Sequence, residues 1–210
     1  MENRVVNVGG RYYGARMRWD HLFDDLAGQL EHELTAEEAD LQREEERLRL
    51  GRLGLRERIV ALRRTRDRAL SELSVVVLGG TRLRVRPVTV GRDWVAGDLD
   101  GRDDAQGVIP FRAIDAIELR DEQVEVSLEA GDPAPDLSSK LGMPFLLRDL
   151  CRRRVGVRID TPVGSVTGTI DRVGRDHLDL AEHELEVPRR RAAVSGVRVI
   201  SLDQVVVVRL

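Results

Sequence analysis

The sequence contains one structural unit twice, and this duplication limits the folds open to the chain. The segments VGRDW (90–94) and VGRDH (173–177) stand 83 residues apart, and the same offset aligns Leu83 with Val166. Around both segments, short apolar runs alternate with glycine-containing turns, a pattern typical of short β-strands. We therefore expect two similar β-rich units.

Helical and strand patterns flank the segments VGRDW and VGRDH. LRERIVALRR (55–64) precedes the first and MPFLLRDLCRR (143–153) precedes the second, each with apolar residues at steps of four and three, which predicts short helices. Downstream, VIPFRAIDAI (108–117) matches EVPRRRAAVSGV (186–197) with a small shift. Each copy thus predicts a short helix followed by about five strands, which bury their apolar faces best by curling into a small barrel.

Composition sets the expected boundaries. Residues 1–17 are expected to form a flexible tail without the apolar core of a signal peptide. An amphipathic acidic helix follows at 18–50, then the first barrel with its leading helix at 51–128. A linker rich in Gly, Pro, Asp and Ser spans 129–142, and the second barrel with its leading helix spans 143–210. The expected fold class is α+β.

An apolar stripe marks the N-terminal helix, with members at steps of three and four: Trp19, Leu22, Phe23, Leu26 and Leu30. Leucine then recurs at every seventh position, at 34, 41, 48, 55 and 62. Glu38, Glu45 and Arg52 would occupy the companion positions of such a seam, and charges there weaken a coiled coil. Two interpretations remain open: a dimeric coiled coil, and a helix packed on its own chain or on a partner.

The second copy resembles the Sm-like fold. VRIDTPVGSVTGTIDRVGRDHLDLAEH, followed by VPRRRAAVSGVRVI, reads as strand, turn, glycine-containing strand and then a Pro-led strand pair. The resemblance covers about 55–120 and 143–210, and it implies tandem Sm-like or SH3-like barrels. RNA-binding Sm-like proteins carry an Asp-x-x-Met-Asn type motif. Ala96 and Asp179 stand in its Asn region here, so the resemblance does not imply that RNA pocket.

Both ends of the chain also resemble an uncharacterised actinobacterial family whose members are often labelled Fis-family transcriptional regulators. RWDHLFDDLAGQL (18–30) and DRVGRDHLDLAEH (171–183) match that family's RWDxLFxDLxxQL and DRVGxDHxxLAEH patterns. The label implies a helix-turn-helix, whereas the C-terminal VVVVRL indicates a strand.

Residue types favour a binding protein over an enzyme. The sequence has no phosphate-binding loop, nucleophile elbow or Cys–His motif, so we expect no enzyme activity, no cofactor and no metal. His177, Asp179 and His183 could share a zinc ion only if the strand folded back, because they span about 20 Å when extended. The first copy has Trp94 where the second has His177, which favours architecture over a metal site.

The predicted function is that of a non-catalytic cytoplasmic adaptor acting through protein partners or self-association of the barrels and the helix. The single cysteine, Cys151, suits a reducing compartment, and no apolar run is long enough to span a membrane. The net charge of -3 argues against bulk attraction to nucleic acid. The alternative is a nucleic-acid-binding regulator with phosphate contacts from two arginine sets: Arg152, Arg153, Arg154, Arg189, Arg190 and Arg191.

Overall fold

The computed structural model describes residues 16–100, 105–129, 137–185 and 194–210, with the side chains of Phe23 and of residues 26 onward. The chain divides into two units, Met1–Arg52 and Leu53–Leu210. Most of the predicted tail and all of Arg189–Arg191 fall outside the described residues.

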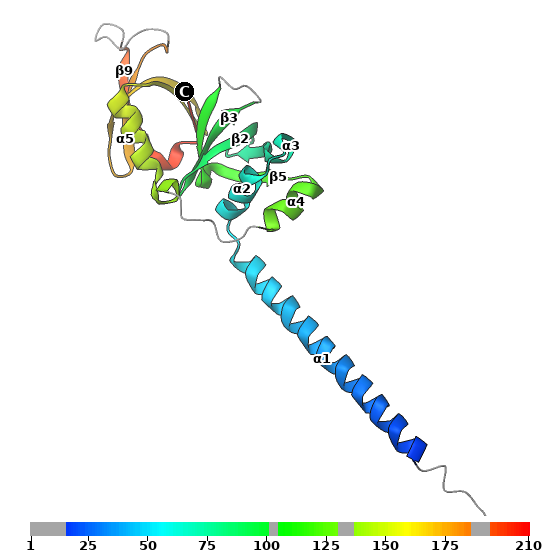
Figure 1. Cartoon of the computed structure of the whole chain (residues 1–210). Helices are drawn as coiled ribbons and strands as arrows, with labels where there is room; N and C mark the ends of the chain where they lie inside the picture. Colours follow the sequence, from blue (N-terminus) through cyan, green and yellow to red (C-terminus); the bar gives the residue numbers. More distant parts are fainter. Residues whose placement is uncertain (1–15, 101–104, 130–136, 186–193) are drawn as a thin grey trace, which may run out of the picture. The chain divides into compact units, whose positions relative to one another are not determined.

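The first unit contains the helix α1 (Arg16–Arg52), drawn in blue to cyan in Figure 1. The helix ends where two glycines disfavour its continuation, and Gly54 is extended immediately before α2 (Leu55–Arg64). The seven-residue leucine repeat is therefore interrupted. Leu62 belongs to α2 and is buried in the second unit, so a continuous seam of five leucines is wrong.

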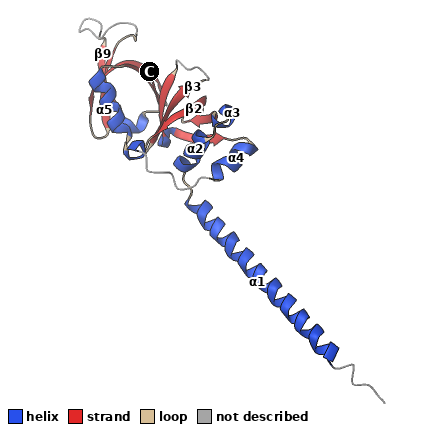
Figure 2. Ribbon diagram, in the orientation of Figure 1, coloured by secondary structure: helices blue, strands red, loops and turns tan. Residues whose placement is uncertain are grey.

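The second unit is α+β, with one ten-stranded antiparallel sheet and short helices (Figures 1 and 2). The strand order is β5-β1-β2-β3-β4-β10-β6-β7-β8-β9. The strands are β1 (Leu73–Val77), β2 (Arg82–Val90), β3 (Trp94–Leu99), β4 (Gln106–Pro110), β5 (Ile114–Glu118), β6 (Gly156–Thr161), β7 (Gly164–Val173), β8 (His177–Glu182), β9 (Gly196–Ser201) and β10 (Val207–Arg209). The helices after α2 are α3 (Arg68–Ser71), α4 (Asp121–Leu128) and α5 (Met143–Arg153), with 3-10 turns at Phe111–Ala113, Leu137–Lys140 and Leu202–Gln204.

The strand pairing of the first half recurs in the second. In each half a strand pairs with the next along the chain, and the irregularity between Pro87 and Thr89 recurs between Ile170 and Arg172. The fifth strands also behave alike, since β5 pairs with β1 and β10 pairs with β6. Equivalent positions can therefore be assigned residue by residue.

One part of the sequence alignment is wrong. The strands equivalent to β4 and β5 are β9 and β10, so the match of 108–117 with 186–197 is displaced toward the N-terminus, and residues 186–193 lie outside the described residues. The Pro-containing similarity misleads because the connection from β8 to β9 is longer than the connection from β3 to β4. Loops tolerate such insertions at little thermodynamic cost.

The strands do not close into two separate barrels. The two halves join through β4 and β10, and the sheet stays open with β5 and β9 at its edges. Two cores nevertheless form. The first contains Ile59, Val60, Leu62, Leu73, Val75, Val77, Leu83, Val85, Val90, Val95, Leu99, Ile109, Ala113, Val206 and Val207. The second contains Trp94, Val108, Met143, Leu147, Leu150, Val157, Ile159, Ile170, Leu178, Leu180, Ile200, Leu202, Val205 and Val208.

The predicted leading helices are confirmed, and each supplies apolar side chains to one core. In α2 these are Ile59 and Leu62, and in α5 they are Met143, Leu147 and Leu150. Proline lies in the first turn of α5, where its missing N–H costs no helical hydrogen bond. In Figure 1, α5 lies beside the strands of the second half, whereas α2 and α4 lie together beside the first half.

Truncation of Leu178 tests the second core. Leu178 is fully buried, so Leu178→Ala should lower the free energy of unfolding by about 2–5 kcal/mol. The control is Val163→Ala in the exposed β6–β7 turn, which should change it by less than about 0.5 kcal/mol. Urea denaturation followed by circular dichroism measures both values, and equal stabilities of the two variants would contradict the assigned core.

Candidate interaction surface

The two halves of the sheet meet at a junction between β4 and β10. Val108 lies opposite Val208, and Gly107 lies opposite Arg209. Side chains alternate across the sheet at this point, as strand geometry requires. Val108 and Val208 therefore belong to the second core, while their neighbour Val207 belongs to the first. Each half thus completes the core of the other.

Polar contacts close the same junction at the start of α5. The Asp93 carboxylate accepts a hydrogen bond from the Met143 backbone N–H at 2.7 Å. The Leu141 carbonyl accepts from the Arg92 backbone N–H at 3.0 Å and from the Trp94 indole Nε1 at 2.9 Å. The carboxylate satisfies a donor that a helix N-terminus leaves unpaired. The VGRDW segment is therefore the turn that docks the first half onto the second.

In the second copy of this turn, VGRDH, the Asp176 side chain contacts a residue of its own segment. The His177 Nδ1 and Asp176 Oδ1 atoms lie 2.8 Å apart, and both side chains are exposed. The hydrogen bond with His177 holds the pKa of the Asp176 carboxyl below its ordinary value. The neighbouring Leu178 and Leu180 are buried in the core.

The outer edges of the sheet carry apolar and charged side chains. On β9, Val197 and Val199 are exposed, and Arg198 donates to Glu182 with an Nε–Oε1 distance of 2.7 Å. On β5, the Glu118 carboxylate accepts from Arg82, with an Nη2–Oε1 distance of 2.6 Å. That hydrogen bond lowers the pKa of Glu118. The sequence offered no signal for these edges, because strand order is a property of the tertiary fold.

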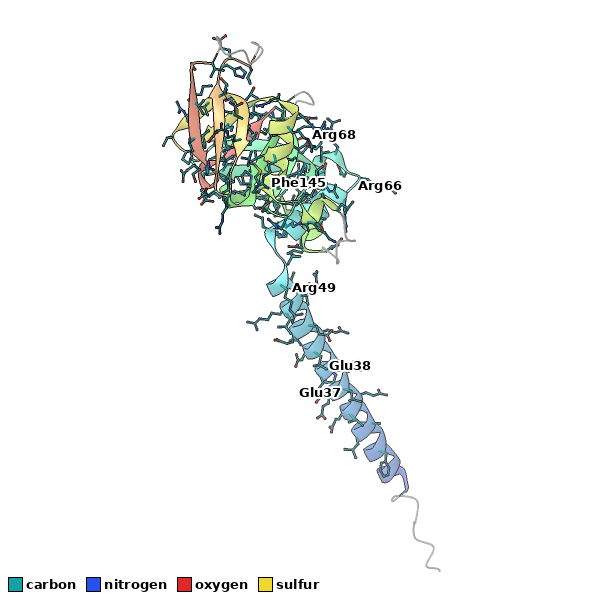
Figure 3. The ribbon with its side chains drawn as sticks, turned by 90° about the vertical axis from the view of Figure 1, so that its left-hand side faces the viewer. Glu37, Glu38, Arg49, Arg66, Arg68 and Phe145 are labelled. Atoms are coloured by element: carbon teal, nitrogen blue, oxygen red, sulfur yellow. The ribbon has the colours of Figure 1, made fainter. Side chains whose placement is uncertain are left out.

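The predicted helix face lies on α1. Phe23, Leu26 and Leu30 are exposed, together with Leu34 and Leu41 further along the helix, while the side chains of Trp19 and Leu22 are outside the described set. Figure 3 shows side chains projecting along α1, with Glu37, Glu38 and Arg49 labelled. In the described part of its unit, α1 has no second element to pack against. The described apolar stripe of α1, which Leu34 and Leu41 extend, is therefore exposed.

The arginines at the end of α5 already have acidic partners. Asp149 binds both Arg152 and Arg153, the latter with an Nε–Oδ2 distance of 2.7 Å. Arg154 lies 2.8 Å from Asp171. The hydrogen bond from Arg153 is the main reason that the pKa of Asp149 is lowered. The predicted phosphate-contacting set is thus partly neutralised.

His177 and His183, which a shared zinc ion would require to lie together, are in different environments. His183 is buried, with Nδ1 2.8 Å from the Glu184 carbonyl and Nε2 2.8 Å from the Thr169 hydroxyl. Because a carbonyl only accepts, Nδ1 donates to Glu184, and in the neutral imidazole Nε2 accepts from the Thr169 hydroxyl. Both ring nitrogens of His183 are therefore engaged within the protein. Among the residues with described positions, no group of three or more His, Cys, Asp or Glu is placed to hold a metal ion.

A cleft of about 340 Å³ lies between the β1–β2 and β6–β7 hairpins. Its polar wall is an ionic cluster in which Asp160 accepts from Arg209 at 2.8 Å and from Arg158 at 3.1 Å. Ser165 also donates to Asp160 at 2.6 Å. Burial raises the pKa of Asp160, but these hydrogen bonds outweigh burial and the net pKa is lowered. The charged groups of the cluster are thus paired with one another.

Comparison of the chain with protein-family models, curated proteins and solved structures gives no match. No helix in the described part of the chain combines the length and apolar character needed to cross a membrane.

The lowered pKa of Asp160 predicts acid sensitivity. A carboxyl with a depressed folded-state pKa stabilises the fold above its ordinary pKa, and that contribution is lost as pH falls through the folded value. As the pH is lowered below about 4, the urea midpoint of the wild type should therefore decrease more steeply than the urea midpoint of Asp160→Asn. Parallel pH profiles of the two proteins would contradict this role for Asp160.

Proposed function

We propose that the protein is a non-catalytic cytoplasmic adaptor that acts through protein–protein contacts, with each half of the sheet serving as an Sm-like unit. The main support is the exposed edge strand β9, on which Val197 and Val199 face solvent. An edge strand presents unpaired backbone groups, and natural proteins usually protect such an edge with lysine, proline or a covering element. The β9 segment GVRVIS contains neither lysine nor proline.

Strand addition gives such an edge both affinity and specificity. An added strand satisfies the backbone donors and acceptors, while alternate side chains select the partner. Burial of an exposed valine is worth about 1.5 kcal/mol or more, so Val197 and Val199 together favour a partner that covers them. The opposite edge, β5, carries Asp115 and Glu118, which favours a partner strand with basic groups.

The helix α1 supplies a second contact surface. An amphipathic helix binds when its apolar face lies in the groove of a partner, and the exposed residues Phe23, Leu26 and Leu30 are spaced for such a face. The polar remainder of α1 is rich in Glu and Arg. We propose that α1 docks a partner protein through this stripe.

Site-specific photo-crosslinking in the host cell tests the adaptor role. A photoreactive phenylalanine analogue replaces Val199 on the edge, Leu41 on the α1 stripe, or the control Val163, which is 96% exposed. The first two positions should give discrete protein adducts because partners cover them. Adduct yields no higher at these two positions than at Val163 would overturn the proposal.

A gel-shift titration separates this proposal from the nucleic-acid alternative. Since Arg152 and Arg153 already share Asp149, mixed DNA and RNA should not be retarded even at low salt. Retardation that weakens steeply with added salt would indicate phosphate contacts and would favour the regulator.

A further inference from the structure

We propose that the partner of the sheet edges is a second copy of this chain, added head to tail, so that β9 of one copy pairs with β5 of the next in the register of β4 with β10. This inference rests on the proposed function, because it names the partner at the same edges. It follows from the duplication. The chain forms one such junction internally, between β4 and β10, and the equivalent strands β9 and β5 lie at the two edges of the described sheet.

The register follows from equivalent residues. The irregular segments and strand pairings equate Val108 with Val199 and Val208 with Ile117. Since Val108 lies opposite Val208 within the chain, Val199 would lie opposite Ile117 of the second copy. Two apolar side chains would thus meet at the centre of the new junction, as they do at the internal one.

Two residues at the proposed contact are exposed, although the equivalent residues at the internal junction are buried. Val108 is 3% exposed, whereas Val199 is 66% exposed. Met143 at the start of α5 is 1% exposed, whereas Leu55 at the start of α2 is 40% exposed. In both pairs, the covered residue lies at the internal junction and its exposed equivalent lies where a second copy would bind.

Charge complementarity supports the same register. Gly107 lies opposite Arg209 in the internal junction, and the equivalents of these two positions are Arg198 and Glu118. Opposite charges would therefore face each other across the two copies. Opposite charges stabilise a cross-strand pair, whereas like charges destabilise it. Glu182 beside Arg198 and Arg82 beside Glu118 would complete an alternating, neutral cluster of four groups.

The docking turn also has an open equivalent. Asp93 accepts from the backbone N–H of Met143 at the start of α5. The equivalent carboxylate is Asp176, whose side chain is 82% exposed, and the equivalent helix start is Leu55. In the assembled pair Asp176 would accept from the N–H of Leu55 of the second copy. The repeated VGRD segment would then perform the same task twice.

The junction between copies should be weaker than the internal one. His177 replaces the buried Trp94, and Asp115 and Ala116 replace Val206 and Val207, so less apolar surface is covered. The association is therefore expected to be reversible and to depend on concentration. Its two surfaces are different, so the contact is heterologous and extends to a closed ring or to an open chain.

Sedimentation of the full chain across the micromolar range tests the contact. The wild type should form species larger than those of Val199→Lys, with about tenfold or greater weakening of self-association in the variant. Val163→Lys changes a valine of greater exposure outside the junction and should assemble like the wild type. Identical sedimentation of wild type and Val199→Lys would overturn the proposal.

Charge-reversal variants test the register in which β9 pairs with β5 of the second copy. Arg198→Glu and Glu118→Arg each place like charges across the junction, so each variant alone should fail to assemble. An equimolar mixture restores an opposite pair at every contact, because each variant supplies the edge that complements the other. Assembly in the mixture but in neither single variant is expected, and a mixture that stays as small as its components would overturn the register.

Failure of self-addition can be distinguished from failure of the adaptor role. Leu41→Glu charges the α1 stripe and should leave the complementation intact. If photo-crosslinks from the Val199 position contain only other proteins and the chain sediments as one species, the adaptor role stands and self-addition fails. If no position gives protein adducts in cells and the chain does not assemble, both fail.

Discussion

The pairing of β4 with β10 is the contact on which the rest of the molecule depends. It brings the last strand of the chain between the two halves, and it divides consecutive side chains of β10 between the two cores. Backbone pairing alone would join the halves loosely. The Asp93 carboxylate adds a hydrogen bond from the backbone N–H at the start of α5. Because the junction uses one edge from each half, it also determines which edges, β5 and β9, stay open.

Duplication explains both the regularity of the sheet and its unevenness. Core positions such as Leu178 and Val95 are apolar in both copies, because each copy must fill its own interior. The copies diverge at the junction positions, where Trp94 and Val108 of the first copy are buried and the equivalent His177 and Val199 of the second copy are exposed. Charged residues also lie at the open edges, where Arg198 pairs with Glu182 and Glu118 pairs with Arg82.

Much of the local structure could be predicted from sequence, and the joining of the halves could not. Period and turn residues predicted the leading helices and the two strand-rich copies, and the aligned VGRD segments located β3 and β8. Strand order, however, depends on contacts between residues far apart in the chain, so two closed barrels and one open sheet have the same local pattern. The insertion before β9 displaced the downstream alignment. The acidic partners of Arg152 and Arg154 come from a helix turn and a neighbouring strand, and composition alone could not assign them.

In the proposed assembly, the junction geometry that is used once within the chain is used again between chains. Hydrogen exchange measured at several protein concentrations tests this claim most directly. Amides of β9 and β5 should become more protected as concentration rises, whereas those of β4 and β10 should be equally protected at every concentration. Protection of β9 and β5 that does not change with concentration would contradict the claim.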